Sequence, residues 1–236
     1  MSFLFSRKAS IESSCVLRGA TDSHSHILFG VDDGIQTLDD SLAALDYLER
    51  QGVRTVWLTP HVMEEVENTT AALQARFGQL REAYTGGIDL HLGAEYMMDT
   101  VFVDRLAARD LLTVGDDMVM IETRYGQQPL EFEKLLAATR SAGYHVLLAH
   151  PERYFYLIWD DYERIHASGV RFQLNLPSLC MQYGPVVYKK ALWLLERRMY
   201  FAAGSDCHRL SRLQEQYLQR TLSKSALAGL NALLHP

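Results

Sequence analysis

The segment LDDSLAALDYLERQGVRTVWLTPH, residues 38–61, contains the pattern that decides the fold. Residues 38–51 carry leucines at helical spacing on one face, which predicts an amphipathic helix. Thr37 is suited to cap the start of this helix, and Gly52 is suited to end it. The apolar and β-branched run at 53–59 then predicts a buried strand, and a histidine follows that strand two residues later.

The same alternation of helix and strand continues along the chain. Strands are predicted at 20–23, 53–59, 88–93, 118–121, 144–149, 170–176 and 200–203, and helices at 38–51, 71–84, 101–109, 130–142, 162–167 and 186–198, with two more helical stretches at the end. This order predicts an α/β fold with a parallel sheet. Seven such units in 236 residues favour a compact barrel. An open doubly wound sheet is the alternative, although no G-x-G-x-x-G motif follows the first strand.

The composition is typical of a globular protein. The chain is 48% hydrophobic and 22% charged, and no apolar run reaches the roughly 18–20 residues that a membrane helix needs. It carries 23 Lys and Arg against 29 Asp and Glu, a net charge of -6. This acidic balance argues against a general nucleic-acid-binding protein.

The N-terminus and the cysteines indicate where the protein acts. Residues 1–20 are predicted to form a loose N-terminal arm, and residues 21–236 a single domain. In the arm, Arg7 and Lys8 follow the apolar residues rather than precede them, which is unlike a secretory signal. The 3 cysteines form no CxxC pair, which argues against a disulfide framework. We therefore expect a cytoplasmic protein.

Histidines and acidic residues recur at the ends of the predicted strands. Because parallel strands end at the same rim, these side chains should meet in one pocket. Carboxylates crowded there would repel one another unless cations neutralise them, so the pattern predicts a metal centre; a network of buried His–carboxylate pairs is the alternative. The candidate ligands are His24, His26, Asp33, His61, Glu95, Glu122, His150, Asp206 and His208.

The donor types indicate the metal and its chemistry. Imidazole and carboxylate without a thiolate cluster suit Mn, Fe or Zn, and so many ligands suit two or three ions. Two ions about 3.5–4 Å apart commonly hydrolyse phosphate esters. Arg153, three residues after His150, could bind a phosphate with its planar fork or form a plain surface ion pair.

Other phosphatase chemistries do not fit the sequence. A cysteine-dependent phosphatase needs an arginine six positions after its cysteine, and none of Cys15, Cys180 and Cys207 has one. The chain also lacks a P-loop and a G-x-S-x-G elbow.

The motifs resemble those of a known family. HSH at 24–26, DDG at 32–34, TPH at 59–61, AE at 94–95, IE at 121–122, AHPER at 149–153 and SDCH at 205–208 occur in the order found in the polymerase-and-histidinol-phosphatase (PHP) superfamily. Within it, the chain is most similar to bacterial manganese-dependent protein-tyrosine phosphatases of capsule and exopolysaccharide loci. The resemblance implies a distorted (β/α)₇ TIM-like barrel with a three-metal site at the C-terminal rim of the strands.

The resemblance also implies roles for single residues. The nine candidates become metal ligands, with Mn²⁺ as the cofactor, and Arg153 contacts phosphate. Beyond the resemblance, we expect Glu95, which follows a central strand, to bridge two ions, and His208 or His61, at the rim of the metal site, to act as the general acid. The expected substrate is phosphotyrosine in the tail of a partner tyrosine kinase that controls polysaccharide export. Ring-forming oligomers occur among such phosphatases, but the sequence identifies no interface.

Several details stay open at this stage. Tyr125, Tyr154 and Tyr156 are candidate walls of the substrate cleft, and Arg124 either reaches substrate or is a plain rim residue. A small-molecule phosphomonoesterase such as a histidinol-phosphate phosphatase would have the same barrel and metals. A nuclease and a non-enzymatic metal-binding scaffold are the remaining alternatives.

Overall fold

The fold is described from a computed structural model, which covers residues 9–219 and 221–235. Its strands are β1 (Ala9–Ser10), β2 (Thr21–Ser25), β3 (Thr55–Leu58), β4 (His61–Val62), β5 (Asp89–Leu92), β6 (Glu95–Met97), β7 (Met118–Glu122), β8 (His145–Leu148), β9 (Arg171–Asn175), β10 (Tyr200–Gly204) and β11 (Thr221–Leu222). Its helices are α1 (Ile11–Ser14), α2 (Leu38–Arg50), α3 (Thr70–Ala83), α4 (Thr100–Ala108), α5 (Phe132–Ser141), the 3₁₀ turn η1 (Pro151–Arg153), α6 (Trp159–Ala167), α7 (Leu176–Leu179), α8 (Gly184–Glu196), α9 (Leu210–Gln219) and α10 (Lys224–Leu234).

The main strands form two parallel sheets. One has the order β10-β9-β8-β7-β6-β4, and the other has the order β2-β3-β5. Two residues separate β3 from β4, and two separate β5 from β6, so these strand pairs continue from the small sheet into the large one. The fold is therefore α/β with parallel sheets, as predicted.

Backbone hydrogen bonds also join β2 to the chain after β10. The Asp206 N–H donates to the His24 carbonyl at 2.8 Å, and the His26 N–H donates to the Cys207 carbonyl at 3.1 Å. The residues that bear candidate ligands on these two segments are thus held side by side.

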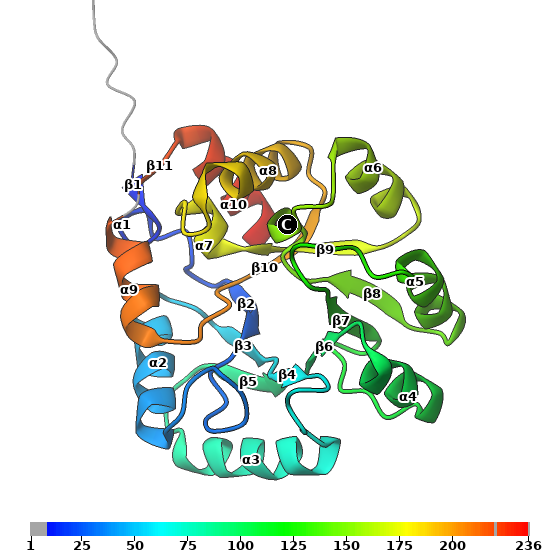
Figure 1. Ribbon diagram of the computed structural model, residues 1–236. Coiled ribbons are helices and arrows are strands. Elements are labelled where there is room, and N and C mark those ends of the chain that lie inside the picture. Colours follow the sequence, from blue (N-terminus) through cyan, green and yellow to red (C-terminus); the bar gives the residue numbers. More distant parts are fainter. Residues whose placement is uncertain (1–8, 220, 236) are drawn as a thin grey trace, which may run out of the picture.

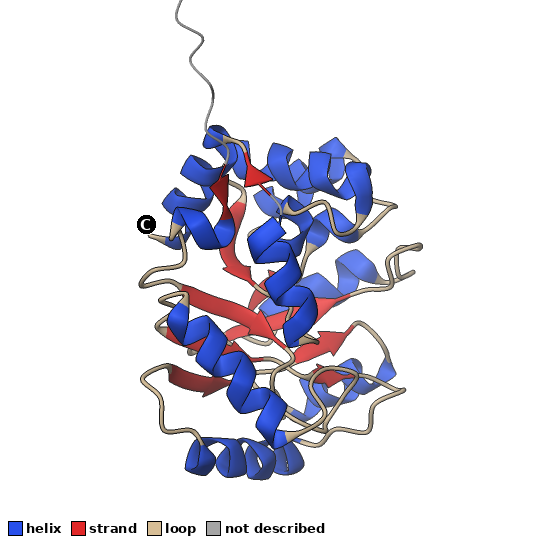
Figure 2. Ribbon diagram, turned by 90° about the vertical axis from the view of Figure 1, so that its left-hand side faces the viewer, coloured by secondary structure: helices blue, strands red, loops and turns tan. Residues whose placement is uncertain are grey.

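Helices cover the outer side of the strands. Figure 1 shows the strands in the middle of the molecule and α2, α3, α4, α5 and α6 at its periphery, and Figure 2 shows helices in front of and above the strands. The Thr37 hydroxyl caps α2 by accepting the Asp40 N–H, as predicted. Among the described residues, every helix is too short or too polar to cross a bilayer.

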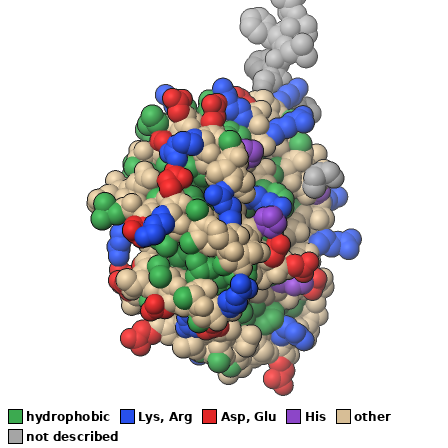
Figure 3. Space-filling view, turned by 90° about the vertical axis from the view of Figure 1, so that its right-hand side faces the viewer, with side chains coloured by type: hydrophobic (Ala, Val, Ile, Leu, Met, Phe, Trp, Pro, Cys, Tyr) green, Lys and Arg blue, Asp and Glu red, His purple; other side chains and the backbone are tan. Residues whose placement is uncertain are grey.

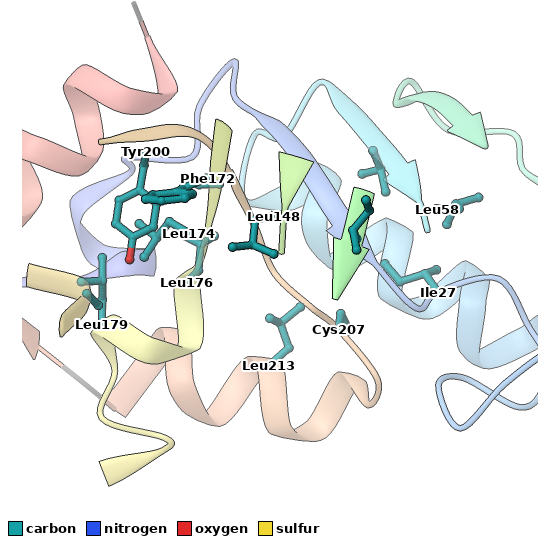
Figure 4. Close-up of a cluster of buried hydrophobic side chains, with 14 of the residues drawn as sticks. Ile27, Leu58, Leu148, Phe172, Leu174, Leu176, Leu179, Tyr200, Cys207 and Leu213 are labelled. Atoms are coloured by element: carbon teal, nitrogen blue, oxygen red, sulfur yellow. The ribbon is translucent and has the colours of Figure 1, made fainter. Parts of the chain in front are cut away.

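An apolar core fills the space between the strands and the helices. In Figure 4, Phe172 of β9 lies beside Tyr200 of β10, and Leu213 points from α9 toward the strands. Burial of such side chains stabilises the fold by about 1.5–3 kcal/mol each. This core lies beneath the strand ends and so supports the polar residues there.

The expected loose arm differs from the structure over residues 9–20. β1 pairs with β11 near the C-terminus, and Ile11, Val16 and Leu17 are buried in the core. Burial of these apolar side chains lowers the free energy relative to a frayed, solvent-exposed terminus. Residues 9–20 are therefore packed against the rest of the chain. The first eight residues lie outside the described residues.

Gly204, the last residue of β10, provides a test of how tightly β10 and β2 pack. A Cβ at position 204 would lie 2.5 Å from His24 Cβ and 2.7 Å from its backbone nitrogen. We expect Gly204→Ala to lower the free energy of unfolding by about 1–3 kcal/mol, because backbone must move to admit the methyl group. Urea denaturation measures this change.

Gly78 in α3 is the matched control, since a Cβ there meets no atom within 4 Å. Gly78→Ala should raise the free energy of unfolding by about 0.5–1 kcal/mol, because alanine is the better helix former. Equal stability of the two variants would contradict the proposed close approach of β10 and β2.

Candidate metal centre

Most candidate ligands lie at or after the carboxyl ends of the parallel strands, and two lie at the interruptions between β3 and β4 and between β5 and β6. His24 belongs to β2, His61 begins β4, Glu95 begins β6 and Glu122 ends β7, while the other candidates lie in the loops that follow strands. Their donor atoms form four overlapping groups, each with all atoms within 4.8 Å of one another. The groups are His26, Asp33, His61 and His208; His24, Glu95 and His150; His24, His26 and Asp206; and His61, Glu95 and Glu122. The structure thus brings together all nine candidate ligands that the sequence singled out.

Glu95 lies at the centre of this cluster and is fully buried. Its Oε2 lies 3.3 Å from both His24 Nε2 and His26 Nε2 and 3.1 Å from His61 Nδ1. Its Oε1 lies 2.8 Å from His150 Nε2. Burial alone would raise the pKa of Glu95, but His24 and His150 hold the pKa well below 4.5. One carboxylate therefore faces four imidazoles.

The mouth of the site carries a second set of groups. Asp33, whose side chain is 74% exposed, lies 3.5 Å from His61 Nε2 and 3.4 Å from His208 Nε2. Its hydrogen bond with His208 lowers the pKa of Asp33 to about 2. Burial lowers the pKa of His61, but the nearby carboxylates of Glu122 and Glu95, 3.0 and 3.1 Å from its Nδ1, outweigh this effect and raise it to about 12. The acidic groups thus favour positively charged groups at the mouth of the site.

The polar neighbours of His24 and His26 fix the protons of both rings. Gln173 Oε1 accepts the His150 N–H and lies 3.1 Å from His24 Nδ1, so the His24 proton sits on Nδ1. Asp32 Oδ2 lies 2.8 Å from His26 Nδ1, so this nitrogen is also the donor. The two Nε2 atoms lie 3.1 Å apart, and each would carry a lone pair in the neutral ring. Two lone pairs at this distance repel, so either a metal ion beside the nitrogens or a proton on one of them is needed. Burial lowers the pKa of His24, but Glu95 outweighs this effect and raises it to about 9, so in the metal-free site a proton can take this place.

A divalent metal fits these donors. Several buried polar atoms at the site have no hydrogen-bond partner among the described residues, although buried polar groups are normally satisfied. The donor set, imidazole nitrogens and carboxylate oxygens, suits Mn, Fe or Zn. The unsatisfied atoms are His61 Nδ1, His150 Nδ1, Glu95 Oε2 and Glu122 Oε1.

Two of the candidate ligands occupy uncommon backbone conformations. His150 has φ 33° and Asp206 has φ 50°, in the left-handed region that glycine prefers. Each residue lies two positions after the end of a strand, β8 or β10, so its left-handed conformation sets the path of the loop that begins there.

A cavity of about 400 Å³ opens over the cluster, and Arg153 forms part of its wall. The Arg153 guanidinium packs against two rings, with its central carbon 4.3 Å from the centre of Tyr125 and 4.2 Å from that of Tyr183. Its Nη1 donates to Asp206 Oδ2 at 2.8 Å, and Asn175 Nδ2 donates to the same oxygen at 2.6 Å. Burial lowers the pKa of Arg153, but Asp206 outweighs this effect and raises it, so the guanidinium stays charged.

The aromatic walls differ from the sequence expectation. Tyr125 lines the cavity as expected, and so does Tyr183, which was not anticipated. Tyr154 is fully buried and its hydroxyl donates to the Ala149 carbonyl, while the Tyr156 hydroxyl bonds with that of Thr123. These two tyrosines therefore support the loops rather than line the cleft.

The structure also shows that Arg124 and Cys207 lie outside the metal cluster. Arg124 Nη2 lies 2.6 Å from Glu65 Oε1 on the surface, outside the residues that line the cavity. Cys207 is buried, and burial raises the pKa of its thiol. Neither side chain contributes to the cluster.

Three buried polar residues that contact the cluster were missed by the sequence reasoning. They are Asp32, Gln173 and Asn175, and each bonds a candidate ligand. Gln173 and Asn175 stand two residues apart in the apolar strand β9. This alternation places both side chains on one face, which is a signal that could have been read.

Comparisons with known proteins agree with this geometry. The family described as "Capsular polysaccharide synthesis, CpsB/CapC" matches residues 20–224. The tyrosine-protein phosphatase YwqE of Bacillus subtilis is 30% identical over 194 residues, which cover 79% of this chain and 76% of that protein. The tyrosine-protein phosphatase CpsB of Streptococcus pneumoniae is 28% identical over 212 residues, covering 84% of this chain and 86% of the relative.

A solved structure is similar over nearly the whole chain. It comes from the crystal structures of YwqE from Bacillus subtilis and CpsB from Streptococcus pneumoniae, described as unique metal-dependent tyrosine phosphatases. The TM-score is 0.73 at 26% identity, and the match covers 91% of this chain and 93% of the other. Since the family match spans most of the sequence, the chain belongs to the CpsB/CapC family of capsular polysaccharide synthesis.

Proposed function

We propose that this protein is a metal-dependent protein-tyrosine phosphatase. The observation that carries the proposal is the cluster of nine histidine and carboxylate donors beneath a cavity that has the partly buried Arg153 in its wall. Relatives at 28–30% identity are named tyrosine-protein phosphatases, which supports the same reaction here. The nine clustered residues would hold two or three ions, with Mn²⁺ as our choice of metal.

Glu95 is the proposed bridging ligand. It is shared by two of the four donor groups, and its two oxygens face different histidines. When bound, the ions would supply positive charge for the phosphoryl oxygens and activate a water molecule.

Arg153 is the proposed phosphate-binding residue. Its guanidinium packs against the rings of Tyr125 and Tyr183, which orient it in the wall of the cavity. One N–H holds Asp206, and the others can bind phosphoryl oxygens in a fork. The two rings also give the cavity apolar walls that suit the ring of a phosphotyrosine.

The leaving group needs little help from a general acid. Tyrosinate has a conjugate-acid pKa of about 10, so it departs more readily than an alkoxide. We propose His208, which lines the cavity, for protonating the leaving oxygen, with His61 as the second candidate. Burial lowers the pKa of His208, but its hydrogen bond with Asp33 outweighs this and raises the pKa to about 9, so the ring can carry a proton while no metal ion is bound to it.

The proposed substrate is a phosphotyrosine protein, namely the tail of a tyrosine kinase that regulates capsule or exopolysaccharide synthesis. Membership of a capsular polysaccharide family supports this setting. We place the reaction in the cytoplasm, which fits the odd number of cysteines. Figure 3 shows Lys and Arg interspersed with Asp and Glu on one face of the molecule, and no continuous basic surface for nucleic acid appears on that face.

We also infer that the strands from β2 to β10 close into one distorted seven-membered barrel within a single domain, residues 21–236. In this barrel, β3 with β4 and β5 with β6 each count as one interrupted strand. The hydrogen bonds between the chain after β10 and β2 support closure on one side. On the other side, β6 pairs with β7, which supports a continuous ring.

Metal removal tests the proposed chemistry. We expect a chelator to abolish hydrolysis of p-nitrophenyl phosphate and Mn²⁺ to restore it, because the clustered carboxylates cannot hold phosphate without cations. Elemental analysis should find two or three divalent ions per chain. Full activity in the presence of chelator would exclude this site as the catalyst.

Replacement of Arg153 tests phosphate binding. Arg153→Ala should lower kcat/KM by about 100- to 1000-fold, the usual loss for one donor to transition-state charge. The matched control is Arg124→Ala, which removes an exposed arginine paired with Glu65. We expect this control to keep wild-type kinetics; equal losses in both variants would refute the role of Arg153.

Substrate competition tests the phosphotyrosine assignment. Steady-state kinetics should give a higher kcat/KM for a phosphotyrosine peptide than for histidinol phosphate, because Tyr125 and Tyr183 give the cavity aromatic walls against which a phenyl ring can pack. The reverse order would identify a small-molecule phosphomonoesterase. Hydrolysis of DNA at a comparable rate would indicate a nuclease.

A further inference from the structure

Asp32 lies behind the metal centre, next to the candidate ligand Asp33 but turned the other way. Its carboxylate is fully buried. Its Oδ2 lies 2.8 Å from His26 Nδ1 and accepts the His61 N–H at 3.0 Å, and its Oδ1 accepts the Gly34 N–H at 2.9 Å. Every contact of this carboxylate is thus with an N–H donor, and one donor is a candidate ligand ring.

Gln173 occupies the corresponding position behind His24. Its orientation is fixed by two backbone groups, because Oε1 accepts the His150 N–H and Nε2 donates to the Leu174 carbonyl. The atom 3.1 Å from His24 Nδ1 is therefore the amide oxygen, which can only accept. The side chain is fully buried, so no solvent competes for this bond.

We propose that Asp32 and Gln173 are positioning residues that hold His26 and His24 in the Nδ1–H form and turn both Nε2 lone pairs toward the metal. The inference rests on the proposed metal-dependent function and deepens it. Hydrogen-bonded partners behind metal-binding histidines fix the tautomer and the ring orientation. Here Asp32 is charged and Gln173 is neutral, and they act on two rings whose Nε2 atoms lie 3.1 Å apart.

A purely structural role would leave the ring protons unaffected. Asp32 also ties the His61 and Gly34 backbone groups, so its removal could loosen the loop without changing the His26 tautomer. The position of the ring proton and the metal affinity separate the two roles, and neither needs a phosphatase assay.

The first measurement needs only the wild-type protein. We expect ¹⁵N NMR of the Zn²⁺-loaded, histidine-labelled full chain to show the proton on Nδ1 in both His24 and His26. A proton on Nε2 in either ring would overturn the inference while leaving metal-dependent hydrolysis intact. Failure of the wild-type protein to bind Zn²⁺ or Mn²⁺ would overturn the proposed function together with this inference.

The second measurement uses variants and competition titration with Zn²⁺. Asp32→Ala and Gln173→Met should each weaken Zn²⁺ binding by about 10- to 100-fold, and Asp32→Asn, which keeps an acceptor for His26, should recover most of the affinity. Asp39→Ala is the matched control, since it removes an exposed aspartate from the first turn of α2. Folding is checked by circular dichroism.

The two positions keep the test decisive if one variant fails to fold, because Gln173→Met acts on a different ring from Asp32→Ala. Affinities of the folded variants within about twofold of the Asp39→Ala control would overturn the positioning role.

Discussion

The structure depends on the electrostatics of one buried carboxylate. Glu95 has no access to water and faces four imidazoles, and Asp206 and Glu122 lie in the same cluster. Such a concentration of acidic groups is stable only where positive charge is supplied. The apolar core beneath the strand ends excludes water, so solvent cannot stabilise these charges from that side. The strands, the core and the polar cluster therefore form one energetic unit, in which cations balance the acidic side chains.

Much of the fold could be predicted because its units are local. The spacing of leucines in α2 and the β-branched run in β3 are sufficient to identify a helix and a strand. The interruption between β3 and β4 was not predictable, because a change of pairing partner depends on strands distant in the sequence. The packing of residues 9–20 was missed for the same reason, since β1 is held by β11 more than 200 residues later.

The sequence was sufficient to predict the candidate metal ligands, but not the residues that hydrogen-bond to them. Strand ends identify residues that meet at a rim, so the clustered His and acidic residues followed from position alone. Asp32 and Asp33 are adjacent in the sequence and differ only in the direction of their side chains, which local pattern does not encode. Tyr154 and Tyr183 show the same limit, because which tyrosine faces the cavity depends on the path of the loop.

The left-handed backbone of His150 and Asp206 has an evolutionary consequence. Such conformations cost about 1–3 kcal/mol in residues other than glycine, and they persist because the surrounding structure holds them. Glycine at position 150 or 206 would relieve the backbone strain but would remove a candidate metal-binding side chain. Selection for robustness and selection for turnover therefore act in opposite directions at these two positions, and drift in a lineage that no longer needed the enzyme would be expected to erase them early.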